Sequence, residues 1–348
     1  MDKAISYGIL AYNSINIGDE IQSIAASRFV PNVDEFVYRE QISDFVPKSG
    51  NITKCILNAW WMWRPEKFPP SKYIDPLLTS LYIKPAIRKK FLTGEVRKFF
   101  LEHGPVGCRD VGTYEWLKRE NIPAYFSGCL TLTLQRNYKI PRQDYILCVD
   151  VPDECIQYIK TKTSRPVYSI SRMLSPYYSS AQRLRLAKII LRLYHDAALV
   201  VSPRLHVILP SLAMETPVLR LIANEEICGE ISRYSGYETF LNSVDITKSI
   251  DDLGNYDFDN PADNPHNHLE VRKNLIKKCS DFTGFDNPES LIDENINPII
   301  ELLQLNEYSN KQIKRIAFWL SPWKLFRIFL RRLFCVDRFA IKDSDFKL

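Results

Sequence analysis

The chain has 348 residues, a length that fits two domains better than one. Its hydrophobic share of 45% and charged share of 25% are ordinary for a globular protein and exclude wholesale disorder, while the mild net charge of +5 suggests no nucleic-acid partner. The eight scattered cysteines contain no C-x-x-C pair, so neither a zinc site nor a disulfide framework is expected.

The first predicted elements open an α/β series. Residues 4–12 are apolar and aromatic, as in a strand, and apolar residues recur at helical spacing over 21–29. The polar turn between them offers Asn16, Asp19 and backbone N–H groups to a ligand. It carries neither the G-x-G-x-x-G fingerprint nor a Walker A sequence. Taken alone, Asp19 is better explained as a helix cap or first-turn acid.

An aromatic loop follows two further predicted strands, at 33–38 and 54–59. In this loop Trp61, Trp63 and Arg64 are close neighbours. Aromatic faces pack against the apolar faces of sugar rings, and an arginine can pair with a carboxylate or phosphate. We therefore expect the loop to border the acceptor side of a site. The alternative is a tryptophan plug in the core between the domains.

Arg109 stands at a second junction of strand and helix. Residues 105–110 end a strand-like stretch where a helix begins, and residues 124–134 close the first half. The polar stretch 135–143 then reads as a linker. These signals predict an amino-terminal Rossmann-like domain over 1–136, on the acceptor side.

The α/β rhythm then restarts and predicts a second Rossmann-like domain over 140–305, on the donor side. Its predicted strands cover 145–149, 166–170, 197–201 and 218–222, and its predicted helices cover 154–160, 181–194 and 291–305.

The centre of this second half is the stretch from Ser202 to His206. An apolar strand precedes it and an apolar helix follows it, so Arg204 and His206 lie at the carboxyl end of a strand, where ligands bind in open α/β sheets. A helix amino-terminus attracts anions, and an arginine adds a planar donor fork. His206 titrates near neutrality when unperturbed. The alternative is a structural arginine and a histidine satisfied by backbone.

The acidic stretch 251–268 contains two weak metal-like patterns, Asp257 with Asp259 and His266 with His268. Because the stretch is rich in Asn and Pro, we interpret it as a solvated loop and expect no metal site.

The tail over 306–348 differs from the rest of the chain. It predicts a basic amphipathic helix that lies on an anionic membrane surface, although a helix packed across the domains is the alternative. The residues expected to contact the membrane are Trp323, Lys324, Phe326, Arg327, Leu330 and Arg331. No apolar run is long enough to span a bilayer, and the amino-terminus lacks a signal-peptide pattern. The prediction is a cytoplasmic protein, peripheral on the inner face of the membrane.

Five short motifs, in order from about residue 5 to about residue 240, resemble the polysaccharide pyruvyl transferase family. They are Asn16–Asp19, Gly107–Asp110, Ser127–Thr131, Pro203–His206 and, more weakly, Arg233–Gly236. The resemblance implies a GT-B-like fold, in which two Rossmann-like halves face each other across a cleft. It also implies phosphoenolpyruvate as donor, a sugar of a cell-surface glycan such as a capsule or exopolysaccharide as acceptor, and no separate cofactor.

The resemblance also assigns roles to residues of this chain. Arg109, Arg204 and the backbone around Leu205 would hold the donor, and His206 would be the general acid that protonates it. Asp19 would act as base or orient the acceptor. The other expected substrate contacts are Asn16, Gly18, Trp61, Trp63, Arg64 and Arg233.

Two alternatives remain open from the sequence. A GT-B glycosyltransferase with a nucleotide-sugar donor would use the same arginines for a diphosphate, and Glu225 or Glu226 for the ribose. A catalytically inactive, membrane-bound scaffold of a glycan-assembly complex would need none of Arg109, Arg204 and His206, so their presence argues against it.

Overall fold

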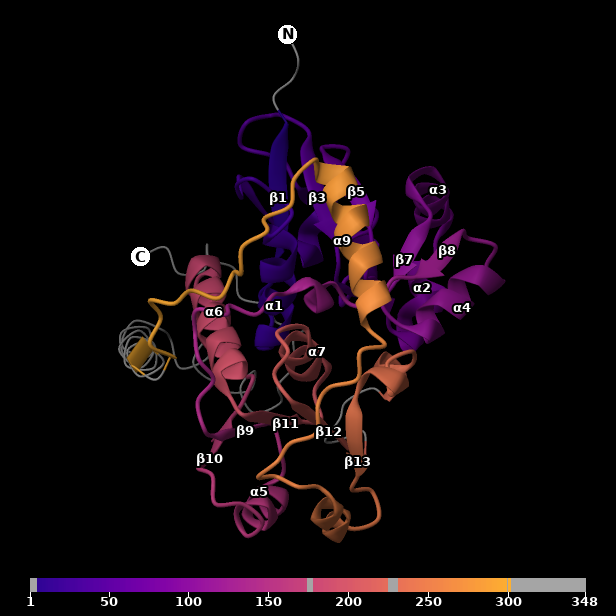
Figure 1. The fold of residues 1–348 in the computed structure, drawn as a ribbon. Helices are drawn as coiled ribbons and strands as arrows, with labels where there is room; N and C mark the ends of the chain where they lie inside the picture. Colours follow the sequence, from indigo (N-terminus) through magenta and orange to yellow (C-terminus); the bar gives the residue numbers. More distant parts are fainter. Residues whose placement is uncertain (1–4, 174–177, 225–230, 299, 302–348) are drawn as a thin grey trace, which may run out of the picture.

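Two parallel β-sheets organise the chain (Figure 1). The computed structural model describes residues 5–173, 178–224, 231–298 and 300–301. The first sheet has the strand order β2-β1-β3-β5, and every neighbouring pair is parallel. Its strands are β1 (Ser6–Ala11), β2 (Glu35–Tyr38), β3 (Thr53–Leu57) and β5 (Ile74–Leu78).

Two short parallel ladders continue the direction of the first sheet. The strand β4 (Trp60–Trp61) follows β3 and pairs with β6 (Tyr82–Ile83), which follows β5. An isolated bridge joins Leu81 to Cys108, at the end of β7 (Val106–Cys108), and β7 pairs with β8 (Ala124–Phe126). The first half therefore forms a run of parallel strands.

The second sheet has five strands in the order β10-β9-β11-β12-β13, again all parallel. Near-continuous apolar runs predicted most of them, because parallel strands are buried on both faces. The strands are β9 (Ile146–Val149), β10 (Val167–Ile170), β11 (Leu199–Ser202), β12 (Val218–Ile222) and β13 (Asn242–Asp245).

Helices connect and cover these strands. The α-helices are α1 (Ile17–Ser27), α2 (Arg88–Phe91), α3 (Gly94–His103), α4 (Val111–Arg119), α5 (Asp153–Lys160), α6 (Ser180–Asp196), α7 (Leu205–Ala213) and α9 (Leu269–Thr283). Short 3₁₀ turns are η1 (Arg39–Asp44), η2 (Pro65–Lys67), η3 (Pro85–Ile87), η4 (Leu130–Thr133), η5 (Ile231–Tyr234), η6 (Glu238–Phe240) and η7 (Ile250–Asn255).

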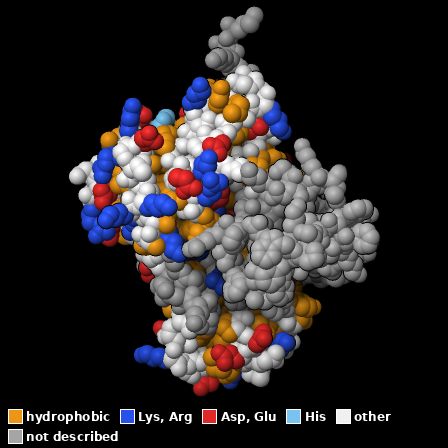
Figure 2. Space-filling model, turned by 180° about the vertical axis from the view of Figure 1, so that it is seen from behind, with side chains coloured by type: hydrophobic (Ala, Val, Ile, Leu, Met, Phe, Trp, Pro, Cys, Tyr) orange, Lys and Arg blue, Asp and Glu red, His pale blue; other side chains and the backbone are white. Residues whose placement is uncertain are grey.

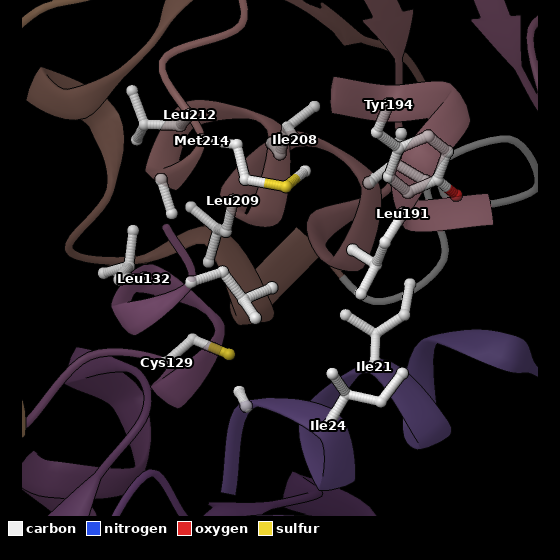
Figure 3. Packing of buried hydrophobic residues seen from close by; sticks show 14 of the residues in the cluster. Ile21, Ile24, Cys129, Leu132, Leu191, Tyr194, Ile208, Leu209, Leu212 and Met214 are labelled. Carbon is white, nitrogen blue, oxygen red and sulfur yellow. The ribbon is translucent and has the colours of Figure 1, made fainter. Parts of the chain in front are cut away.

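The two halves share one hydrophobic core around α1. Ile21 and Ile24 of α1 belong to the same buried cluster as Leu191 of α6, Ile208 of α7 and Cys129 beside η4 (Figure 3). A buried ion pair reinforces the contact between α1 and α6, because Arg183 Nε lies 2.7 Å from Glu20 Oε1. The start of α1 is therefore fixed against the second half.

Helix α9 also joins the halves, because it follows the second sheet in the chain yet packs beside β1 and β3 (Figure 1). Lys54 Nζ of β3 donates to the carbonyl of Phe282, and Tyr7 Oη of β1 donates to the carbonyl of Thr283. The predicted α/β fold with parallel sheets is confirmed. The GT-B-like cleft and the exact domain boundaries stay predictions.

The structure departs from the sequence predictions at several elements. The helix predicted at 291–305 is not formed over 291–297, and helix α9 was not predicted. Helix α1 begins at Ile17, so Gly18 and Asp19 lie in its first turn and not in a preceding loop. Strand β5 was missed, because the proline in Ile74–Leu78 disguises it. The membrane-contacting residues of the tail and the ribose candidates Glu225 and Glu226 lie outside the described residues.

Charged side chains of both signs mix on the face seen in Figure 2. Within the described ranges, no helix is both long and apolar enough to cross a membrane.

Candidate active site

The candidate site forms where the carboxyl ends of strands from both halves meet. Asn16, after β1, accepts a hydrogen bond from Arg172, after β10, with 2.6 Å between Asn16 Oδ1 and Arg172 Nη1. The backbone N–H of Ile17 donates to the carbonyl of Arg172, and Asn16 bridges to Met173. The carboxyl end of parallel strands is the usual ligand-binding edge in such folds.

The amino-termini of α1 and α7 approach each other closely at this edge. Asn16 caps α1, and Arg204 occupies the cap position of α7. A side chain at Gly18 would lie 2.9 Å from Cβ and 3.0 Å from Nδ1 of His206. Only glycine lets the two helices begin so close together. Two positive helix ends thus lie close together, which favours an anion beside them.

Arg109 is buried close to the start of α7. It follows β7 and is 1% exposed. Its Nη1 lies 3.2 Å from Gln22 Oε1 and 3.3 Å from His206 Nε2. Its guanidinium carbon lies 4.8 Å from the centroid of the Tyr82 ring. The structure therefore brings Arg109 and His206 into direct contact from opposite halves of the chain.

Arg109 is a buried cation without a carboxylate partner among the described residues. Its Nε is buried and donates to no hydrogen-bond acceptor among the described residues. Desolvating a charge is costly unless an opposite charge compensates for it. A buried arginine with donors left over is what an anion-binding site requires before its ligand arrives.

A second predicted arginine, Arg233, reaches the same aromatic ring. Its guanidinium carbon lies 5.5 Å from the Tyr82 centroid. The adjoining Tyr237 donates from its hydroxyl to the Arg109 carbonyl at 2.5 Å. Gly236 packs against Phe126 with a φ of +95°, a backbone conformation that favours glycine. The weakest sequence motif, Arg233–Gly236, thus lies beside Arg109.

His206 carries a depressed pKa in this setting. Burial lowers its pKa well below 6.5, and the charges of Arg109, Arg233 and Arg172 lower it further. Because a guanidinium can only donate, Nε2 of a neutral His206 accepts the hydrogen bond from Arg109. The imidazole is therefore neutral when no anion is present.

Asp19 lies one step away, in a buried polar network. Ser14 Oγ donates to Asp19 Oδ2 at 2.8 Å, and Gln22 Nε2 donates to Oδ1 at 3.4 Å. Arg39 Nη1 forms an ion pair with Asp19 at 3.6 Å. Since Gln22 also contacts Arg109, a chain of hydrogen bonds links Asp19 to His206.

The aromatic loop divides into a buried part and a partly exposed part. Trp61 is fully buried and packs on Phe68, with 5.2 Å between the ring centroids. The expectation that Trp61 borders the acceptor is therefore not supported by its position. Trp61 belongs to the hydrophobic core of the first half, so it is a core residue but not a plug between the domains. Trp63 is half-buried and packs on Trp60, 4.8 Å between centroids.

The rest of the loop lies beside the Asp19 network. Arg39 stacks over Trp60, with its guanidinium carbon 5.1 Å from the ring centroid. Arg64 is exposed and pairs with Glu66 at 3.1 Å, so its guanidinium lies at the surface. Trp63 and Arg64 are therefore the members of the loop that can meet a ligand.

The acidic stretch has structural contacts. Asp257 Oδ1 accepts from the backbone N–H of Asp259, whose own Oδ1 accepts from Thr163. His268 is 4% exposed, and its ring contacts the Pro265 carbonyl. In the part of the chain that the structure describes, no group of three His, Cys, Asp or Glu residues could hold a metal ion.

Four residues near the site were missed from the sequence: Gln22, Tyr82, Asp150 and Arg172. Asp150 directly follows one strand that the sequence predicts, and Arg172 lies two residues after another, so the strand-end rule that found Arg109 and Arg204 would have found them too. Gln22 and Tyr82 carry no such signal, because their roles depend on which helix and strand pack together.

A comparison with models of protein families tests the resemblance to the polysaccharide pyruvyl transferase family. Residues 79–226 match the family model for polysaccharide pyruvyl transferase. The match covers less than half of the chain, but it includes Arg109, Arg204 and His206. It leaves out Asn16 and Asp19, on the other side of the site. No curated protein matches the chain significantly.

The predicted family resemblance is confirmed over these residues. It indicates polysaccharide pyruvyl transferase activity in general, and hence a transferase that acts in polysaccharide biosynthesis. Two cations lie near the start of α7, where an anion is favoured: the buried Arg109, which contacts His206, and the half-buried Arg204 at the cap position.

Proposed function

We propose that this chain is a polysaccharide pyruvyl transferase that uses phosphoenolpyruvate as donor and forms a pyruvate ketal on a sugar of a cell-surface glycan. The observation that carries the proposal is Arg109, a 1%-exposed arginine with no carboxylate partner among the described residues. A compact polyanion would supply the charge that this buried guanidinium lacks. Phosphoenolpyruvate carries both a phosphate and a carboxylate.

The two ends of the donor would be shared between two arginines. Arg109 and Arg204 each present a planar fork that matches carboxylate and phosphate oxygens. The backbone N–H groups at Leu205, in the first turn of α7, add donors and the positive end of the helix dipole. No cofactor is required, because phosphoenolpyruvate itself carries the group that is transferred.

His206 would supply the proton that starts the reaction. Donor oxygens would take over the N–H groups of Arg109, which frees Nε2 of His206. The negative charge of the donor would also offset the arginines that depress the pKa of His206. Protonated His206 then gives its proton to C3 of the enol, which makes C2 electrophilic.

The acceptor would close the reaction in two additions. One sugar hydroxyl adds to C2 and loses its proton. A second hydroxyl then forms the other C–O bond at C2 and gives its proton to the phosphate, while the bond from C2 to the phosphate oxygen breaks and inorganic phosphate leaves. Asp19 would take a hydroxyl proton or orient the sugar, and Trp63 and Arg64 would border it. Asn16 and Gly18 would shape the space between the two helix starts.

We further propose that the acceptor is lipid-linked and that the tail over 306–348 holds the enzyme at the inner face of the membrane. The support for this part is the basic amphipathic pattern of the sequence. A glycan carried on a lipid would be within reach of an enzyme that lies on the bilayer.

The direct test is mass analysis of a lipid-linked glycan after incubation with the enzyme and phosphoenolpyruvate. We expect a product heavier by one pyruvate less one water, together with release of inorganic phosphate. Parallel reactions receive nucleotide sugars instead. Transfer from a nucleotide sugar, with none from phosphoenolpyruvate, would show the alternative of a GT-B glycosyltransferase.

A further inference from the structure

We propose that Asp150 is a positioning residue of the donor site, which aims the guanidinium fork of Arg204 at the donor. The inference rests on the proposed function, in which Arg204 binds the donor. Asp150 follows β9 directly, at the same sheet edge as Arg204 after β11. Its side chain is only 10% exposed.

One carboxylate oxygen of Asp150 serves two arginines. Arg204 Nε donates to Asp150 Oδ2 at 3.1 Å, and Arg172 Nε forms an ion pair with the same oxygen at 2.7 Å. The other oxygen, Oδ1, accepts from Ser171 Oγ at 2.9 Å and from the Arg172 backbone N–H at 3.2 Å. The carboxylate is therefore fixed by four contacts.

The contact with Asp150 uses only the inner nitrogen of Arg204. Among the described residues, none accepts a hydrogen bond from either Nη atom of Arg204. The backbone N–H of Arg204 is held by Ser202 Oγ at 3.0 Å, so both ends of this residue are anchored. Two terminal nitrogens remain as a pre-oriented fork, which is the geometry that bidentate anion binding needs.

The contact also couples the donor site to the first half of the chain. Arg172 donates from Nη1 to Asn16, the cap of α1, while its Nε faces Asp150. A continuous set of polar contacts therefore runs from α1 through Arg172 and Asp150 to Arg204. Displacement of the carboxylate would loosen Arg204 and Arg172 together.

The backbone of Asp150 supports a specific role for this residue type. Its φ of +51° is in the left-handed region, where Asp and Asn are the tolerated non-glycine residues. Residues held in such conformations cluster at functional sites. Asparagine can therefore replace Asp150 without new backbone strain, whereas alanine adds strain to the loss of the carboxylate.

A positioning role and a purely electrostatic role of Asp150 predict opposite changes in the affinity for the donor when Asp150 is neutralised. If Asp150 were only a nearby negative charge, its neutralisation would tighten the binding of an anionic donor. If it aims Arg204, Asp150→Asn weakens the binding, because an amide holds the guanidinium less firmly than a carboxylate does. The sign of the change in affinity thus separates the two roles.

The experiment measures the Kd of phosphoenolpyruvate by calorimetry for the wild-type chain, Asp150→Asn and Asp150→Ala. The matched control is Asp153→Asn, an exposed carboxylate three residues along at the start of α5. We expect about tenfold weaker binding for Asp150→Asn, the loss of one charge-assisted hydrogen bond, and unchanged binding for Asp153→Asn. Unchanged or tighter binding in Asp150→Asn overturns the inference.

A double-mutant cycle with Arg204→Lys identifies the partner. If Asp150 acts through Arg204, the loss in Asp150→Asn largely disappears when Arg204 is already lysine. Fully additive losses would contradict a role through Arg204.

A measurement without donor separates this inference from the proposed function. The NMR resonance of the Arg204 Nε–H should shift in Asp150→Asn and not in Asp153→Asn. If the wild-type chain binds no phosphoenolpyruvate, the proposed function fails, and this shift still reports whether Asp150 holds Arg204. An unchanged resonance rejects the contact.

Discussion

Gly18 lies so close to His206 that alanine at position 18 must displace the start of α7, by a distance that the contacts allow us to calculate. A methyl group at position 18 would lie 2.9 Å from His206 Cβ, 3.0 Å from His206 Nδ1 and 3.1 Å from Asn16 Oδ1. Carbon atoms in contact are usually about 3.5–4.0 Å apart. Gly18→Ala must therefore push the start of α7 away from α1 by roughly 0.6 Å or more.

The expected effect falls on activity more than on stability. A displacement of about 1 Å at a reacting group can cost about a hundredfold in rate, so we expect turnover to fall by about 10- to 100-fold. Alanine gains up to about 1 kcal/mol in helix propensity over glycine, whereas overpacking costs about 1–3 kcal/mol. The free energy of unfolding should therefore fall by no more than about 3 kcal/mol.

The assay follows phosphate release from phosphoenolpyruvate in the presence of a glycan acceptor, and urea unfolding gives the stability. Gly94→Ala is the matched control, because Gly94 is the first residue of α3 and no atom lies within 4 Å of an added Cβ. We expect it to leave turnover unchanged. Wild-type turnover in Gly18→Ala, or an equal loss in Gly94→Ala, would refute the reasoning.

Three further predictions concern protonation, the aromatic loop and the tail. If His206 is neutral in the free chain and protonated in the complex with donor, donor binding takes up a proton. The affinity for the donor then falls as the pH rises from the pKa of free His206, which is well below 6.5, to the pKa of His206 in the complex. His206→Asn removes this share of the proton uptake and leaves only the proton release expected when the phosphate, which titrates near pH 6 when free, binds beside arginines; an unchanged uptake would contradict the role. Trp63→Ala should raise the KM of the acceptor and leave the affinity for the donor unchanged. Trp61→Ala should instead lower the free energy of unfolding by about 3–5 kcal/mol. A raised acceptor KM in Trp61→Ala, with stability unchanged, would place Trp61 at the acceptor. A chain cut after Glu307 should stay folded and lose flotation with anionic liposomes, whereas unfolding or undiminished binding would favour a tail packed on the domains.

Much of the fold could be predicted, because most of the parallel strands are short apolar runs bounded by polar residues. The prediction of 218–222 matches β12 exactly. Strand β5 escaped because Pro76 interrupts its apolar pattern, although proline is tolerated on an edge strand, and β5 is at the edge of its four-stranded sheet. The local hydrophobic pattern thus failed to predict β5, because its proline is tolerated only through its position at the sheet edge.

The site could be predicted only as far as chain-local rules reach. Arg109, Arg204 and His206 were found because each lies where a strand ends and a helix begins. The side that each tryptophan of the aromatic loop faces could not be predicted, because β4 has only two residues and gives no alternation to read. The contacts of Gln22 and Tyr82 arise from packing between segments about 90 and 30 residues apart in the chain, which no local pattern encodes.

The central claim is that Arg109, which is buried and forms no ion pair among the described residues, binds the donor, and a titration of Arg109→Met with phosphoenolpyruvate tests it most directly. Methionine keeps a long side chain and removes the charge. We expect affinity to fall by at least about 100-fold, as for two charge-assisted hydrogen bonds, while the free energy of unfolding without donor stays equal or rises. A wild-type chain that does not bind phosphoenolpyruvate, or an Arg109→Met chain that binds it as tightly as the wild type, would contradict the account.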